Sequence, residues 1–276
     1  MINEAAPGQA NPLLQSGRIR EIVGGSTYCV TVGGRSSIEW TEATWNPTTG
    51  CDQISAGCDN CYALTLAKRL KAMGNPKYQS DGDPRTSGPG FGVAIHESAL
   101  DLPRRWRRPR MVFVNSMSDL WHAKVPTDFI KRVFEVMVET PQHNYQLLTK
   151  RPIRLARMAM ELPWPANVWV GVSIENQAQA WRADRLREVT AAVRFISAEP
   201  LLGPIEVDLA GIAWLIAGGE SGPNHRVVNE EWLVSLRDQC HAAGTAFFFK
   251  QWGGLRPKSG GRVLHGETYD QMPVPA

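Results

Sequence analysis

Six short apolar segments recur along this chain, and a polar loop follows each one. The segments are hydrophobic at nearly every position, which is typical of strands that are covered on both faces. They are Met111–Asn115, Tyr145–Thr149, Val168–Val172, Val193–Ser197, Trp214–Gly218 and Ala246–Lys250. This pattern restricts the chain to folds with a buried, mainly parallel sheet.

Between the apolar segments lie stretches with helical spacing. Thr127–Glu139, which follows Pro126, places its apolar residues on one stripe, and Asn229–Ala243 does the same. Strands that alternate with helices form right-handed βαβ units and a parallel sheet. We therefore expect an α/β fold, either a full or partial (β/α) barrel of parallel strands or, as the alternative, a doubly wound open sheet.

The domain organisation follows from composition. Residues 1–36 are rich in Gly, Ser, Asn and Pro and lack periodicity, so we expect a poorly ordered N-terminal extension with one short strand at Tyr28–Val32. The barrel domain is predicted over residues 37–255, and residues 256–276 form a C-terminal tail. The chain has neither a run of membrane-spanning length nor a secretory signal, so we expect a cytoplasmic protein. The net charge of +3 indicates no particular partner.

The loops after the strands are richer in polar and charged residues than the segments before them. They read SMSDLWH, KRP, SIEN, AEPLLG, GESG and QWGG in chain order. Parallel β/α folds build their sites at the carboxyl ends of the strands. The sequence therefore predicts the functional site at that edge.

Cys51, Cys58 and Cys61 have the spacing C-x6-C-x2-C. Three thiolates on one loop can hold three irons of a [4Fe–4S] cluster and leave the fourth iron open. Structural zinc needs four ligands and would have to recruit a distant His or Cys240. Three unrelated buried thiols are the remaining alternative. Cys240 and Cys29 stand alone, and we expect each to be an inert thiol.

The neighbours of the three cysteines favour the cluster. Gly50 and Gly57 each precede a cysteine, where a tight backbone can present N–H groups to sulfur. Tyr62–Ala72 is a predicted helix, and the dipole at its N-terminus favours a negatively charged cluster.

The segment from Ile38 to Cys51, continuing to Ala63, resembles the phage Gp37/Gp68-like family, DUF5131. The later segments NSMSDLWH, LLTKRP, VGVSIEN, SAEPLLG, GGESG and KQWGG are also similar to that family, so the resemblance covers about residues 37–255.

This family in turn resembles radical S-adenosylmethionine (SAM) enzymes of the spore photoproduct lyase-like branch. Those enzymes usually show C-x3-C-x2-C with an aromatic residue before the last cysteine, whereas here the first gap is six residues and Asn60 precedes Cys61. The resemblance implies a [4Fe–4S] cluster, SAM as cofactor and an electron donor such as flavodoxin or ferredoxin. It implies SAM contacts from Ser116, Ser118, Asp119, Thr149, Lys150, Ser173 and Glu175.

The implied reaction is reductive cleavage of SAM to a 5′-deoxyadenosyl radical that attacks a substrate. Glu199, Glu220 and Lys250 follow later strands and are the candidate catalytic residues on the substrate side.

A basic segment suggests a nucleic acid or nucleotide as substrate, because arginines bind phosphates and an indole stacks on bases. Its residues are Arg104, Arg105, Trp106, Arg107, Arg108 and Arg110. A basic rim of Lys68, Arg69, Lys71, Lys150, Arg151 and Arg154 points the same way. Two alternatives stay open: an Fe–S enzyme that does not use SAM, and a nucleic-acid-binding protein stapled by zinc or Fe–S without catalysis.

Overall fold

The computed structural model describes residues 19–23, 26–30 and 38–273. The chain divides into two compact units, Met1–Gly34 and Arg35–Ala276. In the first unit, β1 (Ile19–Val23) pairs antiparallel with β2 (Ser26–Val30), so the structure has two strands where the sequence predicted one. The rest of the predicted extension lies outside the described residues.

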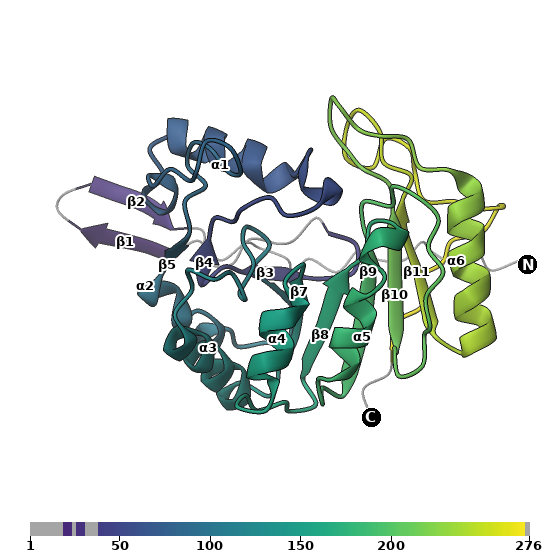
Figure 1. Ribbon diagram of the computed structural model, residues 1–276. Coiled ribbons are helices and arrows are strands. Elements are labelled where there is room, and N and C mark those ends of the chain that lie inside the picture. The colour runs from purple at the N-terminus through teal and green to yellow at the C-terminus, as the bar shows by residue number, and fades with distance from the viewer. Residues whose placement is uncertain (1–18, 24–25, 31–37, 274–276) are drawn as a thin grey trace, which may run out of the picture. The chain divides into compact units, whose positions relative to one another are not determined.

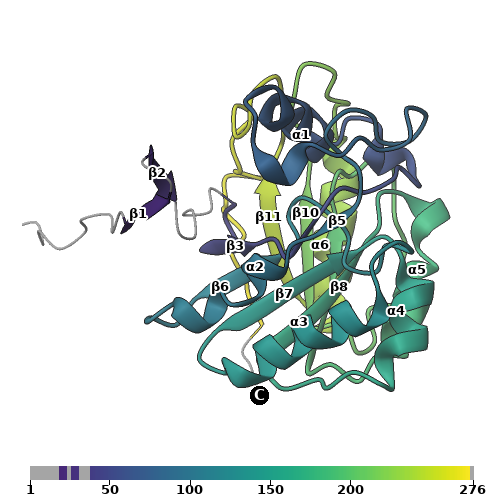
Figure 2. The same cartoon turned by 90° about the vertical axis from the view of Figure 1, so that its left-hand side faces the viewer.

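The second unit is built on a seven-stranded parallel sheet with the order β11-β10-β9-β8-β7-β6-β3. The strands are β3 (Ala43–Trp45), β6 (Met111–Val114), β7 (Asn144–Thr149), β8 (Val168–Ser173), β9 (Val193–Ala198), β10 (Trp214–Gly218) and β11 (Ala246–Gln251). Spatial order follows chain order throughout, so the sheet has no reversal of winding and is not doubly wound. The sheet curls into a half-barrel (Figures 1 and 2), which confirms the predicted α/β partial barrel.

The six predicted strands are confirmed as β6 to β11, each within one residue at either end. A further pair of short strands, β4 (Thr48–Thr49) and β5 (Ala94–Ile95), forms a separate antiparallel ladder.

Helices cover the outer face of the half-barrel, as Figure 1 shows for α3 to α6. The α-helices are α1 (Tyr62–Ala72), α2 (Glu97–Leu100), α3 (Thr127–Glu139), α4 (Pro152–Ala159), α5 (Arg182–Arg187) and α6 (Glu230–Ala243). Four 3-10 helices add η1 (Ala56–Cys58), η2 (Pro76–Tyr78), η3 (Pro103–Arg105) and η4 (Gln177–Gln179). The helices predicted from periodicity are therefore confirmed. In the part of the chain that the structure describes, no helix has the length and apolar character to cross a membrane.

The inner face of the half-barrel changes character along the strands. Its amino half is filled by an aromatic cluster that consists of Trp40, Phe113, Trp169, Phe195, Trp214 and Phe248. Because side chains alternate along a strand, several of the next inward positions toward the carboxyl ends are polar or small. These positions include Gly171 and Ser173 on β8, Ser197 on β9 and Lys250 on β11. The amino end is thus closed by packing, and the carboxyl end presents polar groups.

The C-terminal segment covers the β11 edge of the sheet. The backbone N–H of Phe249 donates to the carbonyl of Tyr269 at 3.0 Å, and that of Gln271 donates to Phe247 at 3.2 Å. The side chain of Leu264 is fully buried. The tail predicted from residue 256 is therefore packed against the barrel as far as it is described.

Candidate functional site

The three clustered cysteines lie on one loop above the carboxyl edge of the sheet. Cys51 follows β4, Cys58 ends η1 and Cys61 is the residue directly before α1. All three are half-buried. Figure 1 shows α1 and this loop lying over the end toward which the barrel strands point. We call residues 51–61 the cysteine loop.

Arg151 binds the first cysteine from the end of β7. One guanidinium nitrogen donates to Cys51 Sγ at 3.2 Å, and the other donates to the carbonyl of Asp52 at 3.0 Å. Burial and the charge of Asp119 together raise the pKa of Cys51 to about 12, although Arg151 lowers it. The sequence indicated Arg151 only as part of a basic rim.

The third cysteine lies against the start of a helix. Burial raises the pKa of Cys61, whereas the backbone amides of Ala63 and Leu64 and the charge of Lys150 lower it. The charge of Cys58 raises the pKa of both Cys51 and Cys61. Cys58 therefore lies within electrostatic range of both other thiols.

The donor chemistry of the loop fits an iron–sulfur cluster. Three thiols share a loop, and the amides of a helix N-terminus and the cations of Lys150 and Arg151 offset the negative charge that such a cluster carries. Among the described residues, no three His, Cys, Asp or Glu side chains already converge as a metal-ion site. Binding a cluster would therefore require the sulfurs to close around it.

The remaining cysteines do not add a ligand from the described residues. Cys240, on the buried face of α6, is free and fully buried in the core, as expected for an inert thiol. Cys29 lies in β2, whose side chains are outside the described part of the chain.

Asp119 orients Arg151. Its carboxylate accepts hydrogen bonds from the hydroxyl of Thr149 at 2.8 and 2.9 Å and from the backbone N–H of Lys150 at 3.1 Å. It also accepts from the N–H of Trp121 at 3.0 Å and from Arg151 at 3.2 Å. The predicted SAM residues Asp119, Thr149 and Lys150 are thus neighbours, but the carboxylate is fully engaged by the protein.

Ser116 and Ser118 lie in the loop after β6. The hydroxyl of Ser116 is 3.2 Å from the side chain of Asn46, and that of Ser118 is 2.6 Å from Thr48 Oγ1. The hydroxyl of Tyr62 donates to the carbonyl of Ser116. This contact ties the first residue of α1 to the loop after β6, at the carboxyl end of the sheet, which we call the barrel mouth. The sequence analysis did not identify Tyr62 as a residue of the site.

Glu175 lies two residues beyond β8 and is fully buried. Ser55 Oγ donates to Oε1 at 2.7 Å, Lys150 Nζ lies 3.4 Å from Oε1, and Arg182 donates to Oε2 at 3.0 Å. Arg182 also donates to the carbonyl of Ser173 at 2.7 Å. Glu175 therefore joins the barrel to the cysteine loop.

Glu220 makes a second link to the cysteine loop from the end of β10. Asn60 donates to Oε2 at 2.9 Å, and Arg226 contacts both carboxylate oxygens at 2.7 and 3.0 Å. Burial favours a raised pKa, but the hydrogen bonds from Arg226 and Asn60 hold the pKa of Glu220 below its usual value. The carboxylate is therefore ionised and bound to cations and amides.

The other two candidate catalytic residues form an ion pair inside the barrel mouth. Lys250 Nζ lies 2.9 Å from Glu199 Oε1, and both side chains are largely buried. Burial of its hydroxyl raises the pKa of Tyr62, and the charges of Cys61 and Glu199 raise it further, although part of the Tyr62 ring is exposed. The pair thus lies within electrostatic range of the start of α1.

The predicted nucleic-acid segment lies away from the cysteine loop. It precedes β6 and so lies at the amino end of the sheet, opposite the cysteine loop. Arg104 is paired with Asp101 and Glu139. Trp106 is 5% exposed in the core with Arg110 over its ring, so its indole is not free to stack on a base. Three exposed arginines remain, namely Arg105, Arg107 and Arg108.

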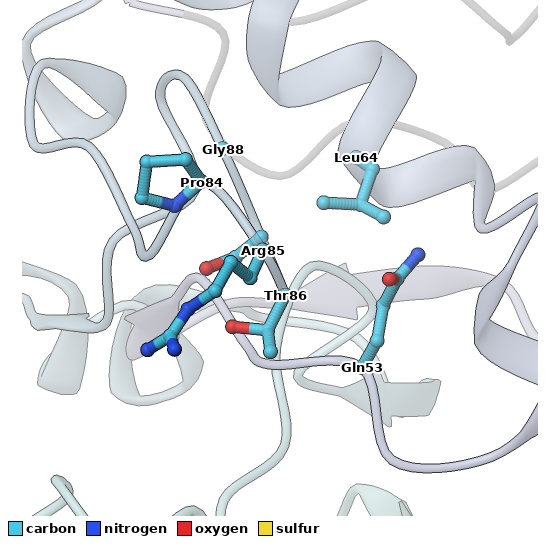
Figure 3. Close-up of a pocket in the computed structure, with 7 residues that line it drawn as sticks. Gln53, Leu64, Pro84, Arg85, Thr86 and Gly88 are labelled. Carbon is cyan, nitrogen blue, oxygen red and sulfur yellow. The ribbon is translucent and has the colours of Figure 1, made fainter.

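A small pocket of about 150 Å³ opens beside the cysteine loop. Figure 3 shows its lining, in which Gln53 and Leu64 face the turn that carries Arg85 and Thr86. Thr86 also hydrogen-bonds Asp52 at 2.9 Å, so this turn supports the loop from a further side.

The sequence matches the family model DUF5131, described as a protein of unknown function, over residues 35–273. This chain belongs to the DUF5131 family. A search of curated proteins gave no match.

Solved structures of spore photoproduct lyase are similar to this member of the DUF5131 family. A complex with dinucleoside spore photoproduct has 13% identity and a TM-score of 0.43, and the match covers 69% of this chain and 59% of that one. A variant with bound AdoMet and dinucleoside spore photoproduct has 12% identity and a TM-score of 0.43, over 79% of this chain and 57% of that one. The chain thus spans less than three-fifths of the length of these structures.

Proposed function

We propose that this protein is a radical SAM-type iron–sulfur enzyme that reductively cleaves SAM and uses the resulting 5′-deoxyadenosyl radical on a substrate. The observation that carries the proposal is the cysteine loop itself. Three thiols on one loop lie over the polar carboxyl edge of a parallel half-barrel, and Arg151 donates to the first of them. Parallel β/α folds place their chemistry at this edge.

In this proposal Cys51, Cys58 and Cys61 hold a [4Fe–4S] cluster. When bound, the cluster supplies the electron that breaks a carbon–sulfur bond of SAM, with methionine and the 5′-deoxyadenosyl radical as products. The protein contributes the position of the thiols and the charge around them. Arg151 and the amides at the start of α1 stabilise negative charge on the sulfurs.

Lys150 is our candidate for the carboxylate of the methionyl group. It follows the last residue of β7, and its charge lowers the pKa of Cys61, so its ammonium acts directly beside the cysteine loop. Ser116, Ser118 and Ser173 remain candidates for other contacts with SAM. Asp119, Thr149 and Glu175 are engaged with protein groups, and for these we propose a supporting role.

The substrate side of the proposed site is the inner mouth near Glu199 and Lys250. We propose a nucleotide or nucleic acid as the substrate class. Lys68 and Arg69 support this choice, because they are exposed cations on the helix that carries Tyr62 over the mouth. A flavodoxin or ferredoxin is the proposed electron donor.

The test is anaerobic purification with iron and sulfide analysis, followed by incubation with dithionite and SAM and an assay for 5′-deoxyadenosine. We expect a brown protein that releases 5′-deoxyadenosine. The product should be lost in a Cys58→Ala variant and retained in the matched control Cys240→Ala, which removes a thiol buried elsewhere in the core.

Two other results would redirect the proposal. A brown protein that binds four irons but does not cleave SAM would indicate an Fe–S enzyme of another kind. A colourless protein with one zinc would support a metal-stapled binding protein.

A further inference from the structure

We propose that Glu175 and Glu220 are positioning residues that together fix Cys58 by binding the cysteine loop on both sides of it. This inference rests on the proposed function only in taking Cys58 as a cluster ligand. The sequence placed Glu175 among the SAM contacts and Glu220 among the catalytic groups. The contacts of both carboxylates point to a different task.

Glu175 binds the part of the loop that precedes Cys58. The hydroxyl of Ser55 donates to its Oε1 at 2.7 Å. The backbone of Gly57 also packs against this side chain, because a Cβ at position 57 would lie only 2.4 Å from Cγ and 2.5 Å from Oε1 of Glu175. A residue with a Cβ could not come this close to the buried carboxylate of Glu175, which explains the glycine directly before Cys58.

Glu220 binds the part of the loop that follows Cys58. Asn60, two residues after Cys58, donates to Oε2 at 2.9 Å. Arg226, which Glu220 holds, extends the contact by donating to the carbonyl of Ala56 at 2.8 Å and to Asp59 at 3.1 Å. The short helix η1 is thus held at both ends.

Neither carboxylate has an oxygen left without a protein partner. Oε1 of Glu175 lies between Ser55 and Lys150, and Oε2 accepts from Arg182. Oε1 of Glu220 accepts from Arg226, and Oε2 accepts from Asn60 and from Arg226. Binding a cofactor through either group would require breaking charge-assisted bonds, which are among the strongest hydrogen bonds in proteins.

The loop that carries Glu220 is itself tightly fixed. A Cβ at Gly219 would lie 2.0 Å from the carbonyl oxygen of Trp252, and one at Gly253 would lie 2.1 Å from that of Glu220. The two backbones after β10 and β11 are therefore in direct contact. A carboxylate on such a loop is a rigid anchor.

The geometry explains the six-residue gap between Cys51 and Cys58. The chain leaves β4 and passes the turn that carries Thr86 (Figure 3), whose hydroxyl donates to Asp52, before it reaches the ends of β8 and β10. A gap of three residues would not leave a separate Ser55 and Gly57 to meet Glu175. We therefore infer that the extra residues serve docking of the loop.

Hydrogen exchange of the metal-free protein tests the proposal without any cluster. The variants are Ser55→Ala and Asn60→Ala, which remove the contact from the loop side and leave each glutamate with its cations. We expect amide exchange in a peptide covering residues 51–61 to become roughly tenfold faster or more, as for loss of a hydrogen bond to a charged group. Ser55→Thr, which keeps the hydroxyl, should restore slow exchange. Glu161→Gln, at an exposed ion pair with Lys131, is the matched control and should leave this peptide unchanged.

The glutamate variants separate positioning from ligand contact. In Glu175→Gln and Glu220→Gln we expect faster exchange of the same peptide, lower iron content after reconstitution and an altered EPR spectrum of the reduced protein. Unchanged exchange in all four loop and glutamate variants would overturn the proposal. So would a Glu175→Gln protein with unchanged exchange and iron content but weakened SAM binding. A wild-type protein that holds no cluster would overturn the proposed function. The exchange rates would still show whether the contacts of Glu175 and Glu220 fix the cysteine loop.

Discussion

His96 is half-buried, and its Nε2 lies 2.8 Å from the hydroxyl of Thr49, just before the cysteine loop. Burial, aided by the charge of Lys77, lowers the pKa of His96 to about 4, whereas a histidine in an unfolded chain titrates near 6.5. Between these values the unfolded state binds more protons than the folded state, so the free energy of unfolding falls as the pH falls through this window.

A His96→Gln variant should therefore lose less stability than the wild type between pH 7.5 and pH 4.5. Urea unfolding at both pH values measures this difference, with the exposed His241→Gln as the control. A variant with the same pH dependence as the wild type would show that His96 does not carry the effect.

At the scale of the element, β8 depends on one glycine inside the barrel. A Cβ at Gly171 would lie 2.5 Å from the ring of Phe195, which itself packs against Trp214 at a centroid distance of 5.6 Å. Gly171→Ala should lower the free energy of unfolding by about 1–3 kcal/mol, because the aromatic cluster has to shift to admit a methyl group.

Denaturant unfolding in a double-mutant cycle with Phe195→Leu checks this explanation, because the alanine should cost less once the ring is gone. Gly203→Ala is the control, since its Cβ would meet only Asn176 at 3.4 Å. An equal cost in both backgrounds would rule out the ring contact as the cause.

The elements also show which features a sequence can reveal. Strands β6 to β11 are covered on both faces and therefore consist of continuous apolar residues, so they could be predicted from the sequence. Strand β3 was missed because it has three residues with a threonine, Thr44, between Ala43 and Trp45.

The tryptophan of the basic segment, Trp106, looked exposed among arginines, yet its ring packs edge-on against His143 at a centroid distance of 5.4 Å. That burial depends on a residue 37 positions later.

In the candidate site, too, features that are local in sequence could be predicted and contacts between distant residues could not. The three cysteines are close in sequence, so their grouping could be predicted. Ser55 and Glu175 are 120 residues apart, and Asn60 and Glu220 are 160 apart. Such pairs arise from the docking of loops on different strands. No local pattern encodes them, so the sequence assigned Glu175 to a SAM contact and Glu220 to a catalytic role.

At the scale of the whole unit, an open half-barrel must protect its edges, because unpaired strand edges recruit other chains. The C-terminal segment protects the edge of β11. Backbone hydrogen bonds join it to Phe247 and Phe249, and the side chain of Gln271 accepts from the N–H of Phe247 at 2.9 Å. The side chain of Leu264 is fully buried. On the opposite side, Lys258 forms an ion pair with Glu39 at 2.8 Å, ahead of β3.

Deletion of residues 262–276 should therefore expose the β11 edge, lower the melting temperature and promote association. Thermal unfolding and size-exclusion chromatography at several concentrations measure both effects, with a deletion of residues 274–276 as the control. If the longer deletion left melting temperature and elution unchanged, the segment would not protect the edge. If it lowered stability without association, the loss would lie in the packing of Leu264, and Leu264→Ala alone should reproduce it at a cost of about 2–5 kcal/mol.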